Sequence, residues 1–302
     1  MNLLITGAFR ASEEQLKFLK DLGFEVCFMQ DEAGEMPISC GNVDAVICNG
    51  LFLHHSIDDF TSLKFIQLTG AGYDRVPIDK INARNIKLFN ARGVYSVPMA
   101  EFALCGVLSL YKKMTNFSEN KKNHIWQKQR DLLELYGRRV CIVGCGSVGT
   151  ECAKRFSAMG CRVVGIDAAP YPNDNFDDMF NLSELGKTLS VSDICILTLP
   201  LSDETYHLFD EKCFGAMKKQ AILVNISRGA VVKTDVLVEA LKTKLYGAVL
   251  DVFEEEPLPA SSPLWDMENV ILTPHNSFVG EGNSERLFNV IINNFKEITG
   301  KC

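Results

Sequence analysis

The sequence predicts an α/β protein with two domains, each built on a parallel sheet covered by helices. Three observations support this fold class. The chain has 302 residues, of which 47% are hydrophobic, and this is enough for two medium-sized cores. Short apolar runs alternate with segments of helical periodicity, as expected for parallel strands joined by crossover helices. The alternation occurs in two series, and the second begins at residue 138.

The first series contains five expected strands, which span 3–9, 24–29, 44–49, 64–69 and 87–90. The segment 12–23 has helical periodicity and ends in Gly23, a residue common at helix C-termini. The turn at Thr6, Gly7 and Ala8 has a single glycine, and we expect it only to close the first strand.

A long helix is expected between the two series, from Pro98 to about Phe117. Proline suits a first helical turn, and Leu104, Leu108 and Tyr111 would then share one face. We expect this helix to bridge the two domains.

The second series contains five more expected strands, which span 138–144, 161–167, 193–200, 221–227 and 246–253. Helices are expected at 150–160 and 233–245, and a loop rich in proline, serine and acidic residues at 254–274. A last helix near 284–298 places Leu287, Ile291, Phe295 and Ile298 along one stripe. Periodicity alone does not say which domain this stripe covers.

Composition and charge exclude several classes of protein. The net charge of −7 argues against a nucleic-acid-binding surface, and the short basic run Lys121–Lys122 near His124 is expected to be a solvated helix end. No apolar stretch reaches the roughly 18 residues of a membrane helix, and no signal peptide is recognisable, so we expect a cytoplasmic protein. The eleven cysteines form no C-x-x-C pair, which favours reduced thiols over disulfides or a zinc site.

A dinucleotide fingerprint follows the first strand of the second series. It consists of Gly144, Cys145, Gly146, Ser147, Val148 and Gly149. Gly144 allows a tight turn, Gly146 lets the backbone approach a pyrophosphate, and Gly149 lets the helix lie close to its strand. The amides at the start of the helix, including those of Ser147 and Val148, would then meet the anion.

Asp167 ends the next strand, about twenty residues after the glycines, where an acidic residue binds the adenosine ribose. A carboxylate accepts hydrogen bonds from both ribose hydroxyls and repels a 2′-phosphate. Ala168, Ala169 and Pro170 follow, without an arginine to neutralise that phosphate. The sequence therefore predicts NAD as the cofactor. The alternative is a fold of this type without a ligand, in which Asp167 only caps a turn.

Three further segments lie at or just after strand ends, where ligands collect in open α/β sheets. They contain Arg228, Glu256 and His275. Together with LTGAGYD at 68–74, MAEFAL at 99–104, LPLSDET at 199–205 and the fingerprint, they make the chain resemble the D-isomer-specific 2-hydroxyacid dehydrogenase family. This family includes phosphoglycerate, glycerate and D-lactate dehydrogenases.

The resemblance implies a domain organisation and an assembly. A Rossmann NAD-binding domain, residues 97–276, would be inserted into a smaller flavodoxin-like substrate domain, residues 1–96 and 277–302. The last helix would return to the first domain, the active site would lie in the cleft between the domains, and two chains would pair through the NAD-binding domain as a homodimer.

The chemistry of the reaction also points to these side chains. Hydride arriving at a 2-oxo carbon leaves charge on the adjacent oxygen, so the site needs a proton donor there and a cation for the substrate carboxylate. His275 and Arg228 would supply these. A carboxylate partner orients a histidine ring and favours its protonated form. Glu254, Glu255 and Glu256 are chemically alike, and the resemblance assigns this role to Glu256.

The resemblance implies further contacts. Gly70, Ala71 and Gly72 would bind the substrate carboxylate through backbone amides, although a plain strand-to-helix turn is the alternative. Leu199, Ile226 and Ser227 would line the cofactor, and Asp251 would hold the nicotinamide amide. The other histidines, His54, His55, His124 and His207, have no motif around them and are expected to be surface or structural residues.

The chain departs from the family pattern in places that concern the substrate. Phosphoglycerate-using members carry a basic residue after the third strand, but here the loop is Gly50 to Leu53. Arg75 stands where many relatives have asparagine, and residues 276–278 replace a commoner small or aliphatic run.

Three other functions are alternatives to this one. L-lactate and malate dehydrogenases carry the fingerprint near the N-terminus, whereas here more than a hundred residues precede it. Formate dehydrogenases have glutamine at the position of Glu256, so the glutamate here argues against that function. A third alternative, which the sequence leaves open, is an NAD(H)-sensing protein similar to the corepressors of the same family. The individual residues also have ordinary explanations: Arg228 as a surface ion pair, Glu256 as a solvated acid and His275 as a hydrogen-bonded loop residue.

Overall fold

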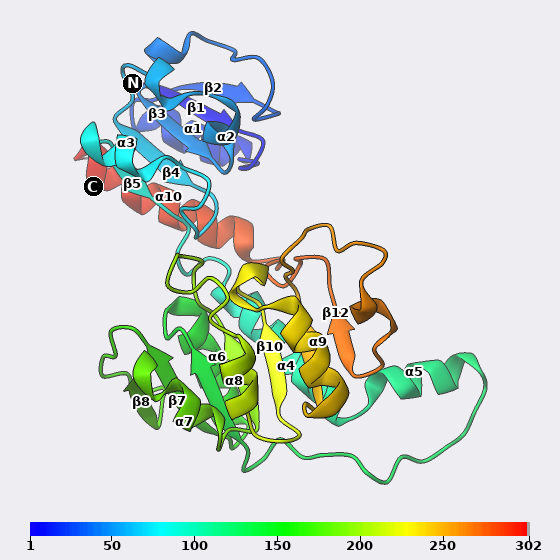
Figure 1. Ribbon diagram of the computed structural model, residues 1–302. Coiled ribbons are helices and arrows are strands. Elements are labelled where there is room, and N and C mark those ends of the chain that lie inside the picture. The colour runs from blue at the N-terminus through cyan, green and yellow to red at the C-terminus, as the bar shows by residue number, and fades with distance from the viewer. Residues whose placement is uncertain (301–302) are drawn as a thin grey trace. The chain divides into compact units, whose positions relative to one another are not determined.

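A computed structural model describes residues 1–300 of the chain (Figure 1). The chain forms two compact units. Unit 1 contains Met1–Tyr95 and the chain from Gly280 onward, and unit 2 contains Ser96–Val279. The boundaries expected from the sequence followed residues 96 and 276.

Unit 1 is a five-stranded parallel sheet in the order β2-β1-β3-β4-β5. The strands are β1 (Asn2–Thr6), β2 (Glu25–Met29), β3 (Ala45–Cys48), β4 (Phe65–Leu68) and β5 (Lys87–Phe89). The helices are α1 (Glu13–Asp21), α2 (Leu51–His54), α3 (Ile78–Ala83) and α10 (Asn283–Thr299). This is the flavodoxin-like strand order, in which the direction of winding reverses between β1 and β3.

Side chains alternate between the two faces of the unit 1 sheet. Leu3 and Ile5 of β1 are buried with α1 and α10, whereas Leu4 is buried with α2 and α3 on the opposite face. Leu287, Ile291 and Phe295 of α10 belong to the first of these clusters. The stripe on the last helix therefore covers unit 1, although more than 180 residues separate it from the rest of that unit.

Unit 2 is a seven-stranded parallel sheet in the order β12-β11-β10-β9-β6-β7-β8. The strands are β6 (Arg139–Val143), β7 (Arg162–Asp167), β8 (Asp178–Asn181), β9 (Ile194–Leu197), β10 (Ile222–Asn225), β11 (Gly247–Leu250) and β12 (Val270–Leu272). Counted from β6, the central strands follow the 3-2-1-4-5-6 order of the Rossmann fold, with β12 added at the edge. The predicted fold class is confirmed.

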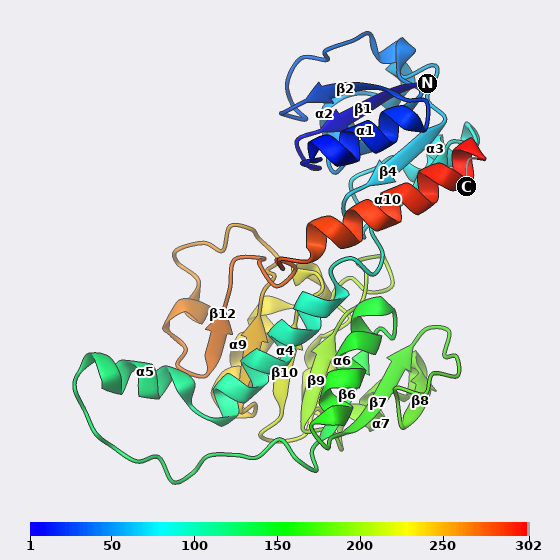
Figure 2. The same ribbon diagram turned by 180° about the vertical axis from the view of Figure 1, so that it is seen from behind.

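Helices cover both faces of the unit 2 sheet. They are α4 (Ser96–Tyr111), α5 (Met114–Lys122), α6 (Ser147–Ala158), α7 (Leu185–Leu189), α8 (Glu211–Ala216) and α9 (Thr234–Thr243). One core cluster joins α4 and α6 to the sheet, and these helices lie in front of it in Figure 2. A second cluster joins α7, α8 and α9 to the other face. All strands run parallel, so their carboxyl ends meet at one edge of the sheet.

The prediction of one long helix from Pro98 to about Phe117 is wrong in its bounds, in its continuity and in the domain to which it belongs. Helix α4 begins at Ser96 and ends at Tyr111, and Lys113, with φ of 50°, separates it from α5. A left-handed residue cannot continue a helix, so the chain turns there. The whole of α4 belongs to unit 2.

The predicted stripe on α4 is confirmed in part, since Tyr111 is buried and Leu104 and Leu108 pack against the same core cluster, but most of the buried face consists of other residues. Its fully buried residues include Ala100, Ala103 and Val107, and a Cβ on Gly106 would lie 2.6 Å from a methyl carbon of Val249. Small residues let the helix approach the sheet and α6 closely. A stripe of large apolar residues indicates only part of this face, because most of its buried residues are small.

Edge elements were harder to predict. Strand β8 is polar and was not expected, and β12 and a 3₁₀ turn at Pro263–Asp266 lie within the segment expected to be a loop. No helix within residues 1–300 is long and apolar enough to cross a membrane. The ten cysteines in the same range are free thiols.

Candidate functional site

The fingerprint forms a tight turn between β6 and α6. Gly144 has φ of 96°, and a Cβ there would lie 2.9 Å from the backbone of Thr198. A Cβ at Gly149 would lie 2.1 Å from the carbonyl oxygen of Gly144. By contrast, nothing lies within 4 Å of a Cβ built on Gly146. Gly144 and Gly149 are therefore required for the turn itself, whereas the space at Gly146 is open, as the predicted approach of a pyrophosphate requires.

Asp167, at the end of β7, is hydrogen-bonded to this turn. Its Oδ2 accepts a 2.8 Å hydrogen bond from the amide of Cys145, and its Oδ1 accepts one of 3.1 Å from the amide of Ala169. Both bonds hold the carboxylate at the carboxyl edge of the sheet, and each oxygen has a further lone pair for a ribose hydroxyl. Burial raises the pKa of the Cys145 thiol to about 12, so this thiol stays protonated and unreactive.

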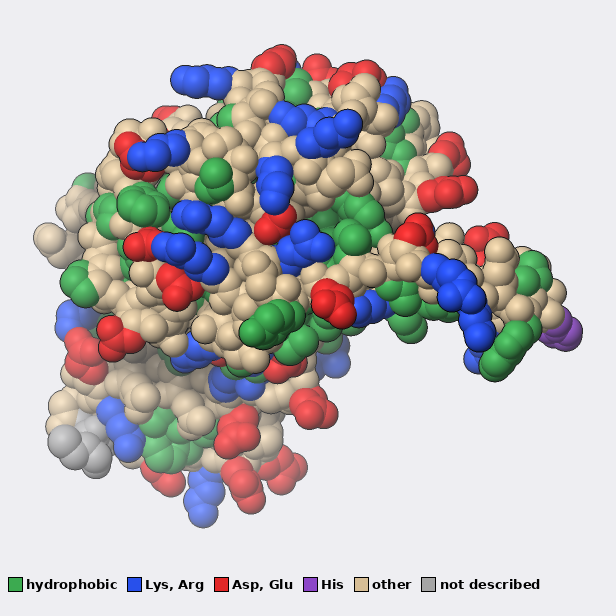
Figure 3. All heavy atoms as spheres, turned by 90° about the horizontal axis from the view of Figure 1, so that it is seen from below, with side chains coloured by type: hydrophobic (Ala, Val, Ile, Leu, Met, Phe, Trp, Pro, Cys, Tyr) green, Lys and Arg blue, Asp and Glu red, His purple; other side chains and the backbone are tan. Residues whose placement is uncertain are grey.

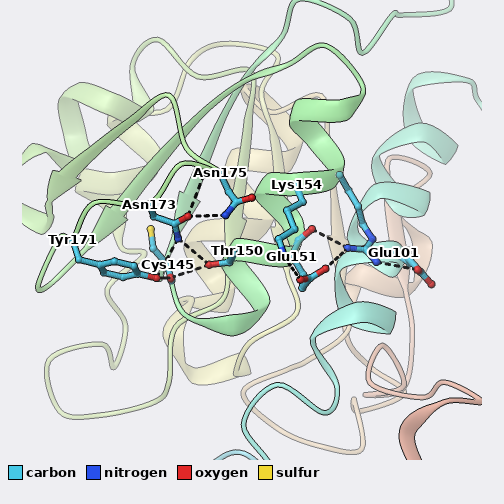
Figure 4. Close-up of polar contacts among 9 residues, drawn as sticks. Glu101, Cys145, Thr150, Glu151, Lys154, Tyr171, Asn173 and Asn175 are labelled. Atoms are coloured by element: carbon cyan, nitrogen blue, oxygen red, sulfur yellow. Dashed lines mark hydrogen bonds and ion pairs between the residues drawn. The ribbon is translucent and has the colours of Figure 1, made fainter. Parts of the chain in front are cut away.

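The segment after Asp167 is attached to the first turns of α6 (Figure 4). The Tyr171 hydroxyl donates a 2.7 Å hydrogen bond to the carbonyl of Cys145, and Asn173 Nδ2 donates one of 3.2 Å to Thr150 Oγ1. Asn173 also accepts hydrogen bonds from Asn175, through its backbone and its side chain. Asp167 thus binds the amide of Cys145 and Tyr171 binds its carbonyl, which fixes this side of the turn, where the ribose is predicted to bind.

Ion pairs hold the other side of α6. Arg155 lies 2.6 Å from Glu151 one turn earlier and 3.1 Å from Glu101 of α4. Figure 4 labels these two acids. These side chains are partly exposed, so each pair contributes at most about 1 kcal/mol to stability. Their main effect is to set the position of α6, which carries the fingerprint, against α4.

His275 follows β12 at the same edge of the sheet. Its Nδ1 lies 2.8 Å from Glu256 Oε2, and Glu256 Oε1 accepts a 3.0 Å hydrogen bond from the amide of Phe253. Glu254, Glu255 and Glu256 could not be distinguished by chemistry, and the structure pairs Glu256 with the histidine. The ring of Phe278 meets the imidazole edge to face at 6.1 Å. With Nδ1 facing the carboxylate, Nε2 is the ring nitrogen that remains for a substrate.

Asp251 holds the loop that carries His275. It is fully buried, and its carboxylate accepts hydrogen bonds from Thr273 Oγ1 and from the amides of Asn276 and Ser277, at 2.7 to 2.9 Å. The His275 amide donates a 2.8 Å bond to the Asp251 carbonyl. The left-handed backbone of His275, with φ of 51°, is stabilised by these contacts. The contact predicted between Asp251 and nicotinamide stays a prediction.

Arg228 lies in the loop after β10, beside the loop after β11. A Cβ on the next residue, Gly229, would lie 1.8 Å from the carbonyl carbon of Phe253 and 2.5 Å from the amide nitrogen of Glu254. The backbones of the two loops are therefore in direct contact at Gly229. This contact places Arg228 and Glu256 in neighbouring loops whose positions depend on each other.

Sequence reasoning missed an interaction between Glu254 and His207. Glu254 Oε1 lies 2.5 Å from His207 Nε2, and Glu254 Oε2 accepts a 2.7 Å hydrogen bond from the amide of Thr234 at the start of α9. The His207 amide also donates to the carbonyl of Ala230, at 2.8 Å. Glu254 thereby fastens the loop that carries Glu256 to α9 and to the segment around His207. His207 is a structural residue, as expected, but its partner is 47 residues away and no local motif reveals it.

This interaction predicts a pH dependence of stability. Burial alone would raise the pKa of Glu254, but hydrogen bonds from Thr234 and His207 hold it below its ordinary value of 4.5. A lowered pKa stabilises the fold above the unfolded-state value, and this contribution is lost as the pH falls below about 4.5. We expect Glu254→Gln to lower the melting temperature at pH 7 and to have progressively less effect below pH 4.5. Glu255→Gln, at an exposed neighbour, should change it little at either pH; a Glu254→Gln effect that does not vary with pH would contradict the assignment.

The glycine-rich loop of unit 1 has its carbonyl groups bound. Residues 90–95 donate hydrogen bonds to three successive carbonyls, through Tyr95 to Thr69, the Ala91 amide to Gly70 and Asn90 to Ala71. In a trans peptide the N–H points opposite to the C=O. The amides of Gly70, Ala71 and Gly72 therefore each point away from these partners, as an anion-binding loop requires.

The remaining residues predicted to line the cofactor lie at the carboxyl edge of the unit 2 sheet. Leu199 follows β9 and is half-buried, whereas Ile226 and Ser227 follow β10 and are buried. Both Ser227 donors, its amide and its hydroxyl, bind Asn225 Oδ1. Among residues 1–300 no cluster of side chains suited to a metal ion is present.

The sequence was compared with known protein families. The sequence model described as the NAD binding domain of D-isomer specific 2-hydroxyacid dehydrogenases matches residues 104–277, more than half of the chain. The chain belongs to the D-isomer specific 2-hydroxyacid dehydrogenase family. It is therefore an oxidoreductase that acts on 2-hydroxy acids with a nicotinamide cofactor.

Other members of this family resemble the chain over most of its length. A glyoxylate reductase of Thermofilum pendens is 32% identical over 276 residues, which cover 87% of this chain and 74% of that protein. A crystal structure of a family protein from Aeromonas salmonicida matches 100% of this chain and 96% of its own with a TM-score of 0.84 and 29% identity. A crystal structure of a family protein from Xanthobacter autotrophicus, in complex with NADPH and MES, matches 99% of this chain and 95% of its own, with a TM-score of 0.81 and 25% identity.

Proposed function

We propose that the protein reduces a small 2-oxo acid to the D-2-hydroxy acid, with His275 as the proton donor. The pairing of His275 with Glu256, 2.8 Å apart at the edge of the sheet where the fingerprint turn also lies, carries this proposal. A bound nicotinamide supplies the hydride. Protonated His275 donates through Nδ1 to Glu256 and gives up its Nε2 proton as negative charge develops on the substrate oxygen. The reverse reaction returns this proton to Nε2.

Arg228 and the glycine-rich loop of unit 1 are proposed to bind the substrate carboxylate. The guanidinium can make two parallel hydrogen bonds to a carboxylate and polarise the adjacent carbonyl. The amides of Gly70, Ala71 and Gly72, whose carbonyl sides are bound elsewhere, are suited to bind a carboxylate. The Thermofilum pendens relative is a glyoxylate reductase. Small 2-oxo acids similar in size to glyoxylate are therefore the proposed substrates.

NAD is proposed as the preferred cofactor. Asp167 places a carboxylate where the 2′-phosphate of NADP would lie, and the residues that follow are Ala168, Ala169 and Pro170, which carry no positive charge. The Xanthobacter protein was solved with NADPH, so cofactor preference varies among similar proteins. The hydrogen bond from the Cys145 amide to Asp167 supports NAD here because it holds the acid beside the fingerprint.

A substrate panel tests the reaction and the cofactor together. Purified protein would be given glyoxylate, pyruvate, hydroxypyruvate, 2-oxoisocaproate and phenylpyruvate, each with NADH and with NADPH. We expect oxidation of NADH with at least one 2-oxo acid and a clearly lower kcat/KM with NADPH. Equal kcat/KM with both cofactors would contradict the role of Asp167. Binding of NADH without turnover of any substrate would favour the NAD(H)-sensing alternative.

A homodimer is the proposed assembly, paired through unit 2. Residues 113–134, here called the arm, contain α5 and an extended segment, and α5 has no buried residue. The arm exposes Met114, Ile125 and Trp126, the last with 97% of its surface accessible. Figure 3 shows apolar side chains on the arm beside Lys and Arg. Apolar groups gathered on a projecting segment are typical of a protein interface.

Trp126→Ala tests this assembly. A tryptophan at the centre of an interface commonly contributes 2 kcal/mol or more to binding. We therefore expect the variant to raise the dimer dissociation constant about thirtyfold or more, measured by sedimentation equilibrium. Phe28→Ala, which removes an exposed aromatic of β2 in unit 1, is the control. A monomeric wild-type protein, or a variant that dimerises normally, would contradict the arm as the interface.

A further inference from the structure

Glu32 occupies the point in unit 1 where the winding of the sheet reverses. In sheets of this order, ligands bind beside the carboxyl ends of the two strands at the reversal, here β1 and β3. Glu32 follows β2 and extends across these ends. Its Oε1 accepts 2.7 Å hydrogen bonds from Thr6 Oγ1 and the Asn49 amide, and its Oε2 accepts one of 2.6 Å from the Gly50 amide.

The charge on Glu32 has no ionic partner. Its three donors are a hydroxyl and two amides, and within residues 1–300 no lysine, arginine or histidine forms an ion pair with it. The side chain is half-buried, so water screens its charge less than that of an exposed acid. The single-glycine turn after β1, expected only to close the strand, is thus part of a negatively charged site.

This carboxylate lies close to the proposed substrate loop. Asn49, whose amide Glu32 binds, has its side-chain Oδ1 3.0 Å from where a Cβ on Gly70 would be. Gly50 lies directly against the carboxylate, since a Cβ on it would be 3.3 Å from Glu32 Oε2. One residue therefore separates the charge of Glu32 from the loop of Gly70, Ala71 and Gly72.

We propose that Glu32 determines specificity by disfavouring substrates with a second anionic group. The inference rests on the proposed function, in which the loop at Gly70 binds the carboxylate common to all 2-oxo acids. Repulsion of that carboxylate is the same for every substrate. A phosphate adds a charge of about −1.5 to −2, and a second carboxylate adds −1, within a few ångströms of the loop. The enzyme therefore selects small 2-oxo acids with an uncharged substituent and discriminates against phosphorylated and dicarboxylic ones.

Glu32→Gln tests this role, because glutamine retains an acceptor oxygen but removes the charge. The measured quantity is the ratio of kcat/KM for 3-phosphohydroxypyruvate to kcat/KM for hydroxypyruvate, with oxaloacetate against pyruvate as a second pair. We expect both ratios to rise about tenfold in the variant, which corresponds to about 1.4 kcal/mol of removed repulsion. The kcat/KM for hydroxypyruvate should also rise, because repulsion of the common carboxylate is removed as well, and the ratio cancels this shared gain. Glu35→Gln, an exposed acid in the same loop, removes the same charge and should leave both ratios unchanged.

The wild-type protein provides a second test that needs no substitution. Repulsion between charges weakens with ionic strength, since the Debye length falls from about 30 Å at 0.01 M to about 10 Å at 0.1 M. The ratio of kcat/KM for 3-phosphohydroxypyruvate to kcat/KM for hydroxypyruvate should therefore rise with salt in the wild-type protein and rise much less in Glu32→Gln. A ratio that is independent of salt in wild type, or one that Glu32→Gln leaves unchanged, would overturn the role of Glu32. In that case reduction of hydroxypyruvate would leave the proposed function standing, whereas failure with every 2-oxo acid would overturn both.

Discussion

His275→Gln should lower kcat for 2-oxo acid reduction by about 10² to 10⁴, the range typical for loss of a general acid. Glutamine can still form a hydrogen bond near Glu256, but it has no proton to transfer at neutral pH. The dissociation constant for NADH should change by less than about threefold, because the fingerprint and Asp167 are held by contacts that do not involve His275. Steady-state kinetics and NADH fluorescence titration would measure the two quantities.

His124→Gln is the matched control for this substitution. His124 also has a left-handed backbone, with φ of 57°, but it lies exposed on the arm. Its replacement should leave kcat unchanged. If His275→Gln weakened NADH binding as much as it lowered kcat, or if it retained most of the wild-type turnover, His275 would not be the proton donor.

Gly229→Ala should damage both stability and activity. The new methyl group would lie 1.8 Å from the carbonyl carbon of Phe253 and 1.9 Å from its oxygen, and both belong to the backbone. The loops that carry Arg228 and Glu256 must then move apart. Overpacking of this kind typically costs about 1–3 kcal/mol of unfolding free energy. Because a displacement of about 1 Å can lower turnover by 10², we expect kcat/KM to fall by at least tenfold.

Gly215→Ala is the control for added volume. Gly215 lies in α8, and no atom is within 4 Å of the position its Cβ would take. Alanine is favoured over glycine in a helix, so this variant should be as stable as wild type or up to about 1 kcal/mol more stable. Urea unfolding and kinetics on the two variants would test the contact. Normal activity in Gly229→Ala would show that the two loops need not touch for the reaction.

Much of the cofactor half of the site could be predicted because its signals are local. The fingerprint places three glycines within six residues; Gly144 and Gly149 have the steric reason expected for them, and the contact of Gly146 with a pyrophosphate stays a prediction. Asp167 follows at the expected distance and binds back to the turn. Residues 171–175, which complete this arrangement, carry no comparable motif, since a tyrosine and two asparagines are typical of any polar loop.

The glutamate that pairs with His275 could be predicted only in part. Three consecutive glutamates precede Pro257, and the residues alone did not distinguish them. In the structure Glu256 binds His275, while Glu254 binds His207 and Thr234. Each of these partners is 19 to 47 residues away from its glutamate. Side-chain direction within one loop decides between them, and composition does not record it.

By itself the sequence determined the two parallel α/β sheets, the dinucleotide turn and the position of Asp167 after it, while the choice of Glu256 as the partner of His275 came from the family resemblance. The first three features follow from local spacing: apolar periodicity sets the strands, and glycines set the turn. Only the tertiary structure decided that the last helix covers unit 1, that the chain breaks at Lys113, and that Glu32 lies across the ends of β1 and β3. These features depend on contacts between residues distant in the chain, and such contacts form only when the strands take their order in the sheet.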